Sequence, residues 1–541
     1  MVARATYPDE LLPFIQNEAH PEGAKHYPLG EYIAILKSRT ASTAAKGDAE
    51  QAIQQEIPDD FNVLGLVEQL QGDGLLNRFA TRLWKYKESD PKFYPDLLHL
   101  VLSIYAETPN NLAIGREGFA AWRKTKGATD FDVDDSLLAI YNPTWQKSIN
   151  RSKPDSAENK NQKGFWLSEY LKMVGLPRCA LVVSVRSGHS QFIEEDKKVY
   201  VLAPASVDIQ SHESIMKGFR SSIYRTTSIK ADIEVLLKYV EAFLMYLQRS
   251  QQRRGFRKAR DTVDGFYCAY FKKSSKHRSA LSLTNLPFLQ LPAWIRFQDV
   301  PTENEIALYQ GIVQHQRDVL FYRYNDSGKS VDFIDENQSE GAAILSDYRE
   351  FLSGSSLSAL LAFYAEFGAL IMHQASQKKS FRQFETSQIR RLLETMTPNL
   401  QRTLDNEGFR EVARAIRLCT VTAQRLKSKK IKTQHEIRYG LAQELKRKAP
   451  FKNEFTTAIM EFINQYQTEN ARARERGKSN IHEVTTTDIR NLSALIDACP
   501  GDSAEPVASL LLAFGYAYDD DPKEEEFAAD DTADNTQGVT R

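Results

Sequence analysis

The stretch SLSALLAFYAEF at residues 356–367 decides the fold of the C-terminal part of the chain. Its large apolar residues recur at the three- and four-residue spacing of one helical face. These residues are Leu357, Leu360, Leu361, Tyr364 and Phe367. Three more stripes with this spacing follow, in residues 451–466, 489–496 and 507–514. Short polar breaks that contain Gly or Pro separate them, so the sequence predicts an antiparallel helical bundle.

Upstream of this bundle, strand and helix signals alternate. The β-rich runs are ALVVSVR (180–186), KVYVLA (198–203), residues 266–271 and residues 294–297, and a long helical pattern covers residues 230–250. The apolar runs 319–324 and 330–334 flank NDSGK and predict a hairpin. The fold class predicted is therefore α+β, a mixed α/β N-terminal part followed by an all-α C-terminal helical bundle.

We expect four segments along the chain. They are an N-terminal segment (1–60), an α/β domain (61–350), the helical bundle (351–518) and an acidic, disordered tail (519–541).

The composition of the 541-residue chain is that of an ordinary globular protein, with 42% hydrophobic and 26% charged residues. It has no apolar run of the roughly 18 residues that a membrane span needs, and the first residues lack an apolar signal region. A cytoplasmic protein is expected. The four cysteines form no CxxC pair, and no Cys/His group has zinc spacing, so we expect neither a metal nor a cofactor.

The net charge of −1 conceals a strong segregation of charge. Residues 519–541 hold nine acids against Lys523 and Arg541. Residues 249–278 hold ten Lys and Arg against two acids, and residues 409–448 hold twelve against three. Two strongly basic tracts on a chain with a net charge near zero favour a polyanionic partner, although solvated basic faces remain the alternative.

Two motifs suggest catalytic chemistry but do not complete it. Ser327-Gly328-Lys329-Ser330 resembles the end of a phosphate-binding loop, yet Arg323 stands where that loop needs glycine, and a β-rich run follows. Asp130, Asp132, Asp134 and Asp135 lie in TDFDVDD without the Gly and Glu of a calcium loop. We interpret the first motif as a hairpin turn and the second as a turn that caps a following helix.

Three basic features remain as candidate nucleic-acid contacts. At about 100° per residue, Arg410, Arg414, Arg417 and Arg425 fall within about 80° of one another, so a helix would pack one face and present guanidinium groups on the other. The 249–278 tract combines basic with aromatic residues, as single-strand binders do. Its candidate backbone contacts are Arg253, Arg254, Arg257, Lys258, Lys272 and Lys273.

The third feature is the polar stretch at residues 142–163, which is predicted to be a loop. It is rich in amides and cations, which suit base edges and phosphates of a duplex groove. Its candidate duplex contacts are Asn142, Gln146, Lys147, Asn150 and Arg151.

The C-terminal third also resembles a known family. The runs IRYGLAQELKRKAPFKNEFTTAIMEFINQYQTENARARER (437–476) and TTTDIRNLSALIDACPGDSAEPVASLLLAFGYAY (485–518) are similar to the terminal helical bundle of large subunits of type I CRISPR Cascade complexes. The similarity is to the I-A/I-B type, including relatives carried by CRISPR-associated transposons.

This resemblance implies a non-catalytic role in RNA-guided DNA binding and antiviral defence. Such a subunit binds the crRNA 5′ handle, reads the PAM in double-stranded target DNA and helps to open the duplex. Its bundle guides the displaced strand, and it contacts other Cascade subunits and a helicase-nuclease or transposition proteins. Two other functions stay open: a metal-dependent nuclease that uses the Asp130–Asp135 cluster, and a helical scaffold that binds no nucleic acid.

Overall fold

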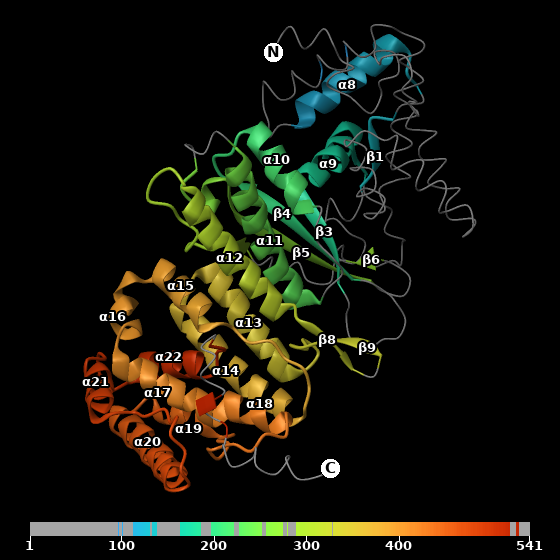
Figure 1. Ribbon diagram of the computed structural model, residues 1–541. Helices are drawn as coiled ribbons and strands as arrows, with labels where there is room; N and C mark the ends of the chain where they lie inside the picture. Colours follow the sequence, from blue (N-terminus) through green and yellow to red (C-terminus); the bar gives the residue numbers. More distant parts are fainter. Residues whose placement is uncertain are drawn as a thin grey trace. The chain divides into compact units, whose positions relative to one another are not determined.

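The computed structural model in Figure 1 has an α+β fold, as predicted, with small sheets in the N-terminal half and helices in the C-terminal part. The residues it describes are 96, 100, 112–129, 132–137, 163–185, 196–220, 227–250, 256–273, 278–279, 288–326, 328–519, 526–527 and 529.

The described residues divide into two compact units. The first takes in those up to residue 202 together with 267–288, and the second takes in 203–266 and the residues from 289 onward. The expected boundary between residues 350 and 351 therefore lies inside the second unit, within helix α13 (Ser339–Gly354). The expected segment 1–60 lies outside the described residues.

The first unit is built around an aromatic core. Its elements are α8 (Leu112–Lys126), β1 (Asp134–Ser136), β2 (Lys163–Phe165), α9 (Trp166–Cys179), β3 (Ala180–Val185) and parts of the next strands. The ring of Phe119 lies 5.9 Å from that of Phe165 and 5.1 Å from that of Trp166, and all three side chains are buried. Asp134–Ser136 pairs as a strand with β2, so the turn expected in TDFDVDD is wrong at these residues, and residues 138–162, where the capped helix is expected to begin, lie outside the described residues.

A five-stranded sheet has the order β3-β4-β5-β6, with β7 paired to β5. The remaining strands are β4 (Asp196–Pro204), β5 (Val263–Lys273), β6 (Arg278–Ser279) and β7 (Phe288–Gln290). β3 and β4 are antiparallel, with Ala180 opposite Val201.

The strand predicted at residues 294–297 is wrong. Its backbone makes only an isolated bridge from Arg296 to Lys258. Trp294, Ile295 and Phe297 are nevertheless buried. An apolar run signals burial, which irregular backbone can also provide.

The hairpin predicted around NDSGK is present. It pairs β8 (Arg323–Asp326) with β9 (Lys329–Asp332), and Gly328 adopts φ +82° in the turn. Glycine adopts this conformation without strain because it has no Cβ. The hairpin turn therefore accounts for Gly328, the glycine that gave this sequence its resemblance to a phosphate-binding loop.

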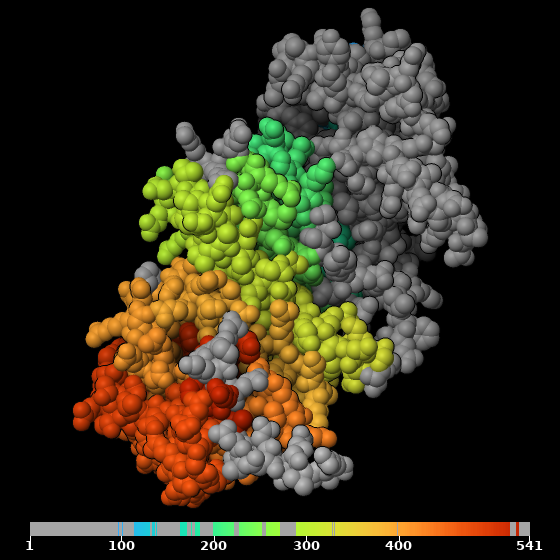
Figure 2. Space-filling view, in the orientation of Figure 1, coloured from blue at the N-terminus to red at the C-terminus, as the bar shows by residue number. Residues whose placement is uncertain are grey.

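The second unit consists mainly of helices (Figure 1). Those before the predicted bundle are α10 (Ile209–Arg220), α11 (Ser228–Arg249) and α12 (Glu303–Leu320). Those that follow α13 are α14 (Leu357–Ser376), α15 (Thr386–Met396), α16 (Gln401–Leu404), α17 (Glu407–Arg417), α18 (Ala423–Ser428), α19 (Leu441–Lys448), α20 (Lys452–Glu475), α21 (Thr486–Asp497) and α22 (Glu505–Gly515). In Figure 2 their orange and red atoms form a continuous surface.

The four predicted apolar stripes lie in α14, α20, α21 and α22. Their residues are buried or half-buried, except that Phe451 precedes α20 and is 53% exposed. Among the described helices, α14 alone is long and apolar enough to cross a membrane, and 61% of its most apolar window is buried inside the structure. It packs against α13, α18, α19 and α22, so it is a core helix here.

Helix α11 is buried around most of its surface and carries charged side chains into the interior. Lys238 lies 3.3 Å from Glu234, Asp232 lies 3.1 Å from Arg349, and Lys230 lies 3.3 Å from Asp332. Between α17 and α18, residues Leu418–Thr422 form a π-helical turn whose side chains are all buried.

Candidate nucleic-acid interface

Helix α17 is held between α21 and α22 by two close approaches. Asn406 caps its first turn by accepting a hydrogen bond of 2.9 Å from the Phe409 amide. A Cβ on Gly408 would collide with the Asp488 carbonyl oxygen of α21, and one on Gly515 of α22 would collide with Ile416. Glycine is required at both contacts, and the third side of α17 carries the arginines.

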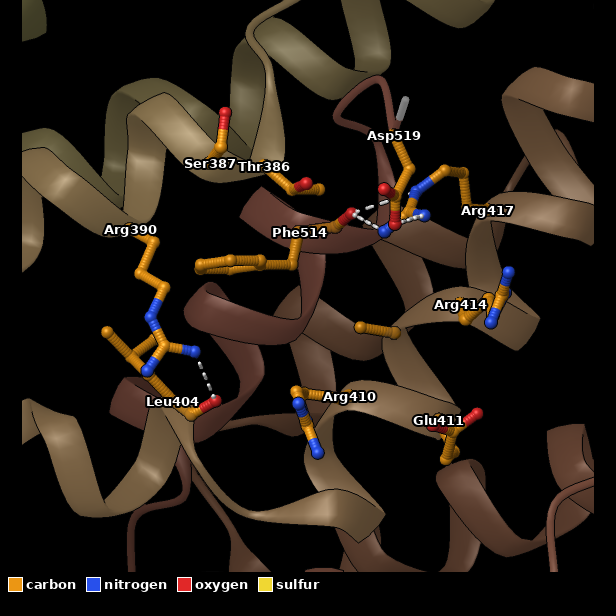
Figure 3. A pocket seen from close by; sticks show the side chains of 11 residues that line it. Thr386, Ser387, Arg390, Leu404, Arg410, Glu411, Arg414, Arg417, Phe514 and Asp519 are labelled. Atoms are coloured by element: carbon orange, nitrogen blue, oxygen red, sulfur yellow. Dashed lines mark hydrogen bonds and ion pairs between the residues drawn. The ribbon is translucent and has the colours of Figure 1, made fainter. Parts of the chain in front are cut away.

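A cavity of about 320 Å³ lies beside that third side (Figure 3). The structure brings Arg410, Arg414 and Arg417 together there, as their helical spacing predicts. The residues that line the cavity are Thr386, Ser387, Arg390, Leu404, Arg410, Glu411, Ala413, Arg414, Arg417, Phe514 and Asp519.

The expectation that the helix presents these guanidinium groups on its unpacked face is wrong for Arg417. This side chain is 4% exposed, and its guanidinium lies 2.7 Å from the Asp519 carboxylate. It also donates to the Phe514 carbonyl at the end of α22, at 3.1 and 3.3 Å. Arg417 is therefore a structural cation, because the residues after α22 cover this part of the helix.

The other three arginines keep different degrees of exposure. Arg410 is exposed, and no described residue makes an ion pair with it. Arg414 is half-buried, with its guanidinium carbon 5.2 Å from the Phe527 ring centre, and Arg425 is half-buried, 5.3 Å from that of Tyr518. Arg425 does not line the cavity. Among the arginines of α17 that line the cavity, Arg410 is therefore the exposed one.

The carboxylates at the cavity are already engaged within the chain. Asp519 pairs with Arg417, and Glu411 accepts a 2.7 Å hydrogen bond from His482 Nε2. That hydrogen bond holds the pKa of Glu411 below its usual value, so the carboxylate stays charged. His482 Nδ1 lies 2.8 Å from the Tyr466 hydroxyl, which fixes the ring.

Helix α15 adds a fourth arginine and a helix N-terminus. Arg390 pairs with Glu394 at 2.8 Å, also pairs with Asp405, and donates to the Leu404 carbonyl at 3.4 Å. Thr386 and Ser387, the first two residues of α15, line the cavity with hydroxyl groups. The first amide of this helix, that of Thr386, already donates to the Tyr518 carbonyl at 2.9 Å.

The lining thus has four cations and two carboxylates. Arg390 and Arg417 are paired with carboxylates of the chain, and Arg410 is the exposed cation of the lining. Such a site attracts a small anionic group, and arginine can donate two parallel hydrogen bonds to a phosphate. A cavity of this size suits one phosphate group of a polymer or a small anion.

The 249–278 tract is only partly organised as expected. Arg257 and Lys258 are exposed, but Phe256 and Phe266 are buried and cannot stack on bases. Tyr267 is 51% exposed and its ring centre lies 4.9 Å from that of Phe288. Alternation along strand β5 explains the difference, because neighbouring aromatics point to opposite faces. Arg253 and Arg254 lie outside the described residues, and Lys272 and Lys273 are described by backbone only.

The predicted duplex contacts Asn142, Gln146, Lys147, Asn150 and Arg151 all lie outside the described residues.

Two of the three described carboxylates of TDFDVDD, those of Asp132 and Asp134, lie close to arginines of α8. Asp134 pairs with Arg116, and Asp132 lies 3.9 Å from Arg123. Alternating positions on an extended segment point to one side, and that side faces the helix. The metal-dependent nuclease alternative, which needs convergent carboxylates, gains no support from this arrangement.

One buried group was missed because its members are far apart in sequence. Metal-ligating atoms of Cys419, His435 and Glu469 lie within 4.8 Å of one another. Glu469 lies 3.1 Å from His435 Nδ1 and 2.8 Å from Arg438. Burial acts to raise the pKa of Glu469, but these hydrogen bonds hold it below its usual value. Because Arg438 already matches the carboxylate charge, we interpret the group as an ion-pair network that fixes residues 433–438 against α20.

Sequence reasoning also missed Arg390, the N-terminus of α15 and Asp519 as parts of the cavity. No local pattern joins these residues to α17, since tertiary packing alone brings them there. No protein-family model matches this chain, and no curated protein is significantly similar to it.

Proposed function

We propose that this protein binds nucleic acid through backbone phosphates at the cavity beside α17, and catalyses no reaction on it. The observation that carries the proposal is the convergence of four arginines on one cavity whose two carboxylates are engaged by His482 and Arg417. The exposed Arg410, the half-buried Arg414 and the hydroxyls of Thr386 and Ser387 would contact a phosphate.

We propose further that the nucleic acid is that of a type I CRISPR Cascade, with this chain as its large subunit. Support comes from the family resemblance of residues 437–476 and 485–518, and α17 and α18 precede these runs in the chain. On this proposal the partners are crRNA, PAM-bearing target DNA, the displaced strand, other Cascade subunits and a helicase-nuclease or transposition proteins. A cytoplasmic location belongs to the same proposal.

The cavity would hold the backbone of a single strand or of an opened duplex. Phosphates carry no base information, so this site would supply affinity and register rather than sequence preference. PAM reading would fall to the 142–163 segment, through the amides of Asn142, Gln146 and Asn150 and the cations of Lys147 and Arg151.

The test is the salt dependence of binding by the double variant Arg410→Ala/Arg414→Ala. Removing one phosphate-binding side chain should lower the slope of log affinity against log salt by about 0.7 for a single strand or 0.9 for a duplex. The double variant should therefore reduce the slope by about 1.4–1.8, with little change in sequence preference. Fluorescence anisotropy with labelled oligonucleotides over a range of salt concentrations measures it.

The matched control is Arg472→Ala/Arg490→Ala, which removes two exposed arginines of α20 and α21 that do not line the cavity. An unchanged slope in the cavity variant, or an equal reduction in the control, would place phosphate binding elsewhere.

A wild-type chain with no salt-dependent binding would favour the scaffold alternative, and Mg²⁺-dependent cleavage that Asp132→Asn abolishes would favour the nuclease. In the assembled complex, alanine at all five 142–163 candidates should abolish the preference for PAM-bearing duplex, and unchanged preference contradicts that assignment.

A further inference from the structure

The segment after α22 returns across the arginine side of α17 and α18. Its backbone joins the start of α15, where the Thr386 amide donates to the Tyr518 carbonyl at 2.9 Å. Asp519 then pairs with Arg417, and the Tyr518 ring lies beneath Arg425. Figure 3 shows Asp519 at the edge of the cavity, beside Arg417.

The chain reaches the same surface again at residues 526–529. Phe527 and Ala529 pack against Leu418 and Leu426, which are both buried. The Phe527 ring also lies against His482, with 6.1 Å between ring centres, and under Arg414. This short stretch is therefore docked by apolar contacts next to the groups that line the cavity.

A buried lysine holds the docked stretch by its backbone. Lys478 is 7% exposed, and its ammonium donates to the carbonyls of Glu526 and Phe527 at 3.1 Å each and also to that of Ala529. Thr433 makes an isolated antiparallel bridge to Ala529. Residues between Arg414 and Thr433 and the loop that contains Lys478 and His482 thus converge on Glu526, Phe527 and Ala529.

The sequence that contains these docked residues has the same sign of charge as a nucleic acid backbone. Residues 519–541 hold nine acids against two cations. Through Asp519, Tyr518 and Phe527 this part of the chain contacts Arg417, Arg425 and Arg414, three of the four arginines predicted to meet nucleic acid. A nucleic-acid strand that binds to Arg414, Arg417 and Arg425 as well as to Arg410 must therefore displace the C-terminal segment.

We infer that the acidic C-terminal segment is a built-in competitor of nucleic acid for the arginine surface. The inference rests on the proposed nucleic-acid function and names its regulation. Tethering gives the segment an effective concentration in the millimolar range without any requirement for tight binding. Nucleic-acid strands that bind weakly or non-specifically fail to displace the C-terminal segment. A strand that is also bound elsewhere in an assembly has a high local concentration at this surface, so it can displace the segment.

The experiment compares the full chain with a chain that ends at Asp519, which keeps the Arg417 ion pair. The probe is a fluorescein-labelled 20-nucleotide single-stranded DNA, at about 0.1 M salt. If the segment is docked about nine-tenths of the time, its removal raises the affinity about tenfold. Phe527→Ala in the full chain, which removes the ring that packs on Leu418 and Leu426, should raise it in the same direction.

Two further variants separate the possible outcomes. A full-length chain with Glu524, Glu525, Glu526, Asp530, Asp531 and Asp534 changed to Gln or Asn tests charge without truncation, and it should also bind more tightly. Combining the truncation with Arg410→Ala/Arg414→Ala should remove the gain. If full and truncated chains bind the probe equally, the competitor inference fails and the proposed function stands. If neither binds in a salt-dependent way, the proposed function fails and the inference fails with it.

Discussion

Helices α11 and α17 both carry charged side chains against the protein interior, but they differ in how those charges are balanced. On α11 the buried Lys238, Asp232 and Lys230 each have an opposite charge within 3.3 Å. On α17 the arginines exceed the carboxylates around them, and Arg417 is balanced by Asp519 of the C-terminal segment. The charges of α11 are thus matched inside the fold, whereas on α17 Arg417 is balanced by a residue of the C-terminal segment and Arg410 is exposed at the cavity.

The largest expected effect is on α11. Glu234→Ala removes the carboxylate 3.3 Å from Lys238, whose side chain is 1% exposed. Burial already lowers the pKa of Lys238, so an ammonium deprived of this partner should cost about 3–5 kcal/mol of unfolding free energy. Urea unfolding monitored by circular dichroism measures the loss.

The control for this prediction is the double variant Glu234→Leu/Lys238→Met. It replaces the pair by apolar groups of similar size and should recover most of the stability. A single variant as stable as the wild type would show that the pair is not a matched buried charge, and the contrast with α17 would then disappear.

A smaller difference is expected between two arginines of α17 itself. Arg417→Ala breaks a buried ion pair and two hydrogen bonds to the Phe514 carbonyl, so we expect a loss of about 2–4 kcal/mol. Arg410→Ala, at an exposed position, should change stability by no more than about 0.5 kcal/mol. Parallel thermal and urea unfolding distinguishes them, and equal losses would mean that both arginines serve the fold.

The smallest effect concerns pH. Because the hydrogen bond from His482 depresses the pKa of Glu411, the carboxylate contributes stability above the ordinary value of 4.5, and this contribution disappears as pH falls through the depressed folded pKa. Glu411→Gln should therefore flatten the decline of unfolding free energy below pH 4.5. A decline identical to that of the wild type would show that Glu411 is not held charged by His482.

Much of the fold followed from local patterns, and less of the site did. Helical spacing was enough to place the stripes of α14 and α22 in the core, and Gly328 with its flanking strands was enough for the hairpin. Spacing also grouped Arg410, Arg414 and Arg417, but it could not foresee that Asp519, which is 102 residues from Arg417, would bury the last of them. The strand expected at Trp294–Phe297 failed because apolar content reports burial and not backbone geometry.

The π-helical turn at Leu418–Thr422 separates the rotational phase of α17 from that of α18. In an uninterrupted α-helix each residue advances by about 100°, so the direction of Arg417 would dictate that of Arg425. The wider turn accommodates an extra residue and sets the second helix back by about one position. Arg417 and Arg425 therefore point in similar directions and contact two adjacent residues of the segment after α22, Asp519 and Tyr518. Deleting a single residue within the turn should therefore restore regular α-helical geometry and leave the directions of Arg417 and Arg425 nearly unchanged.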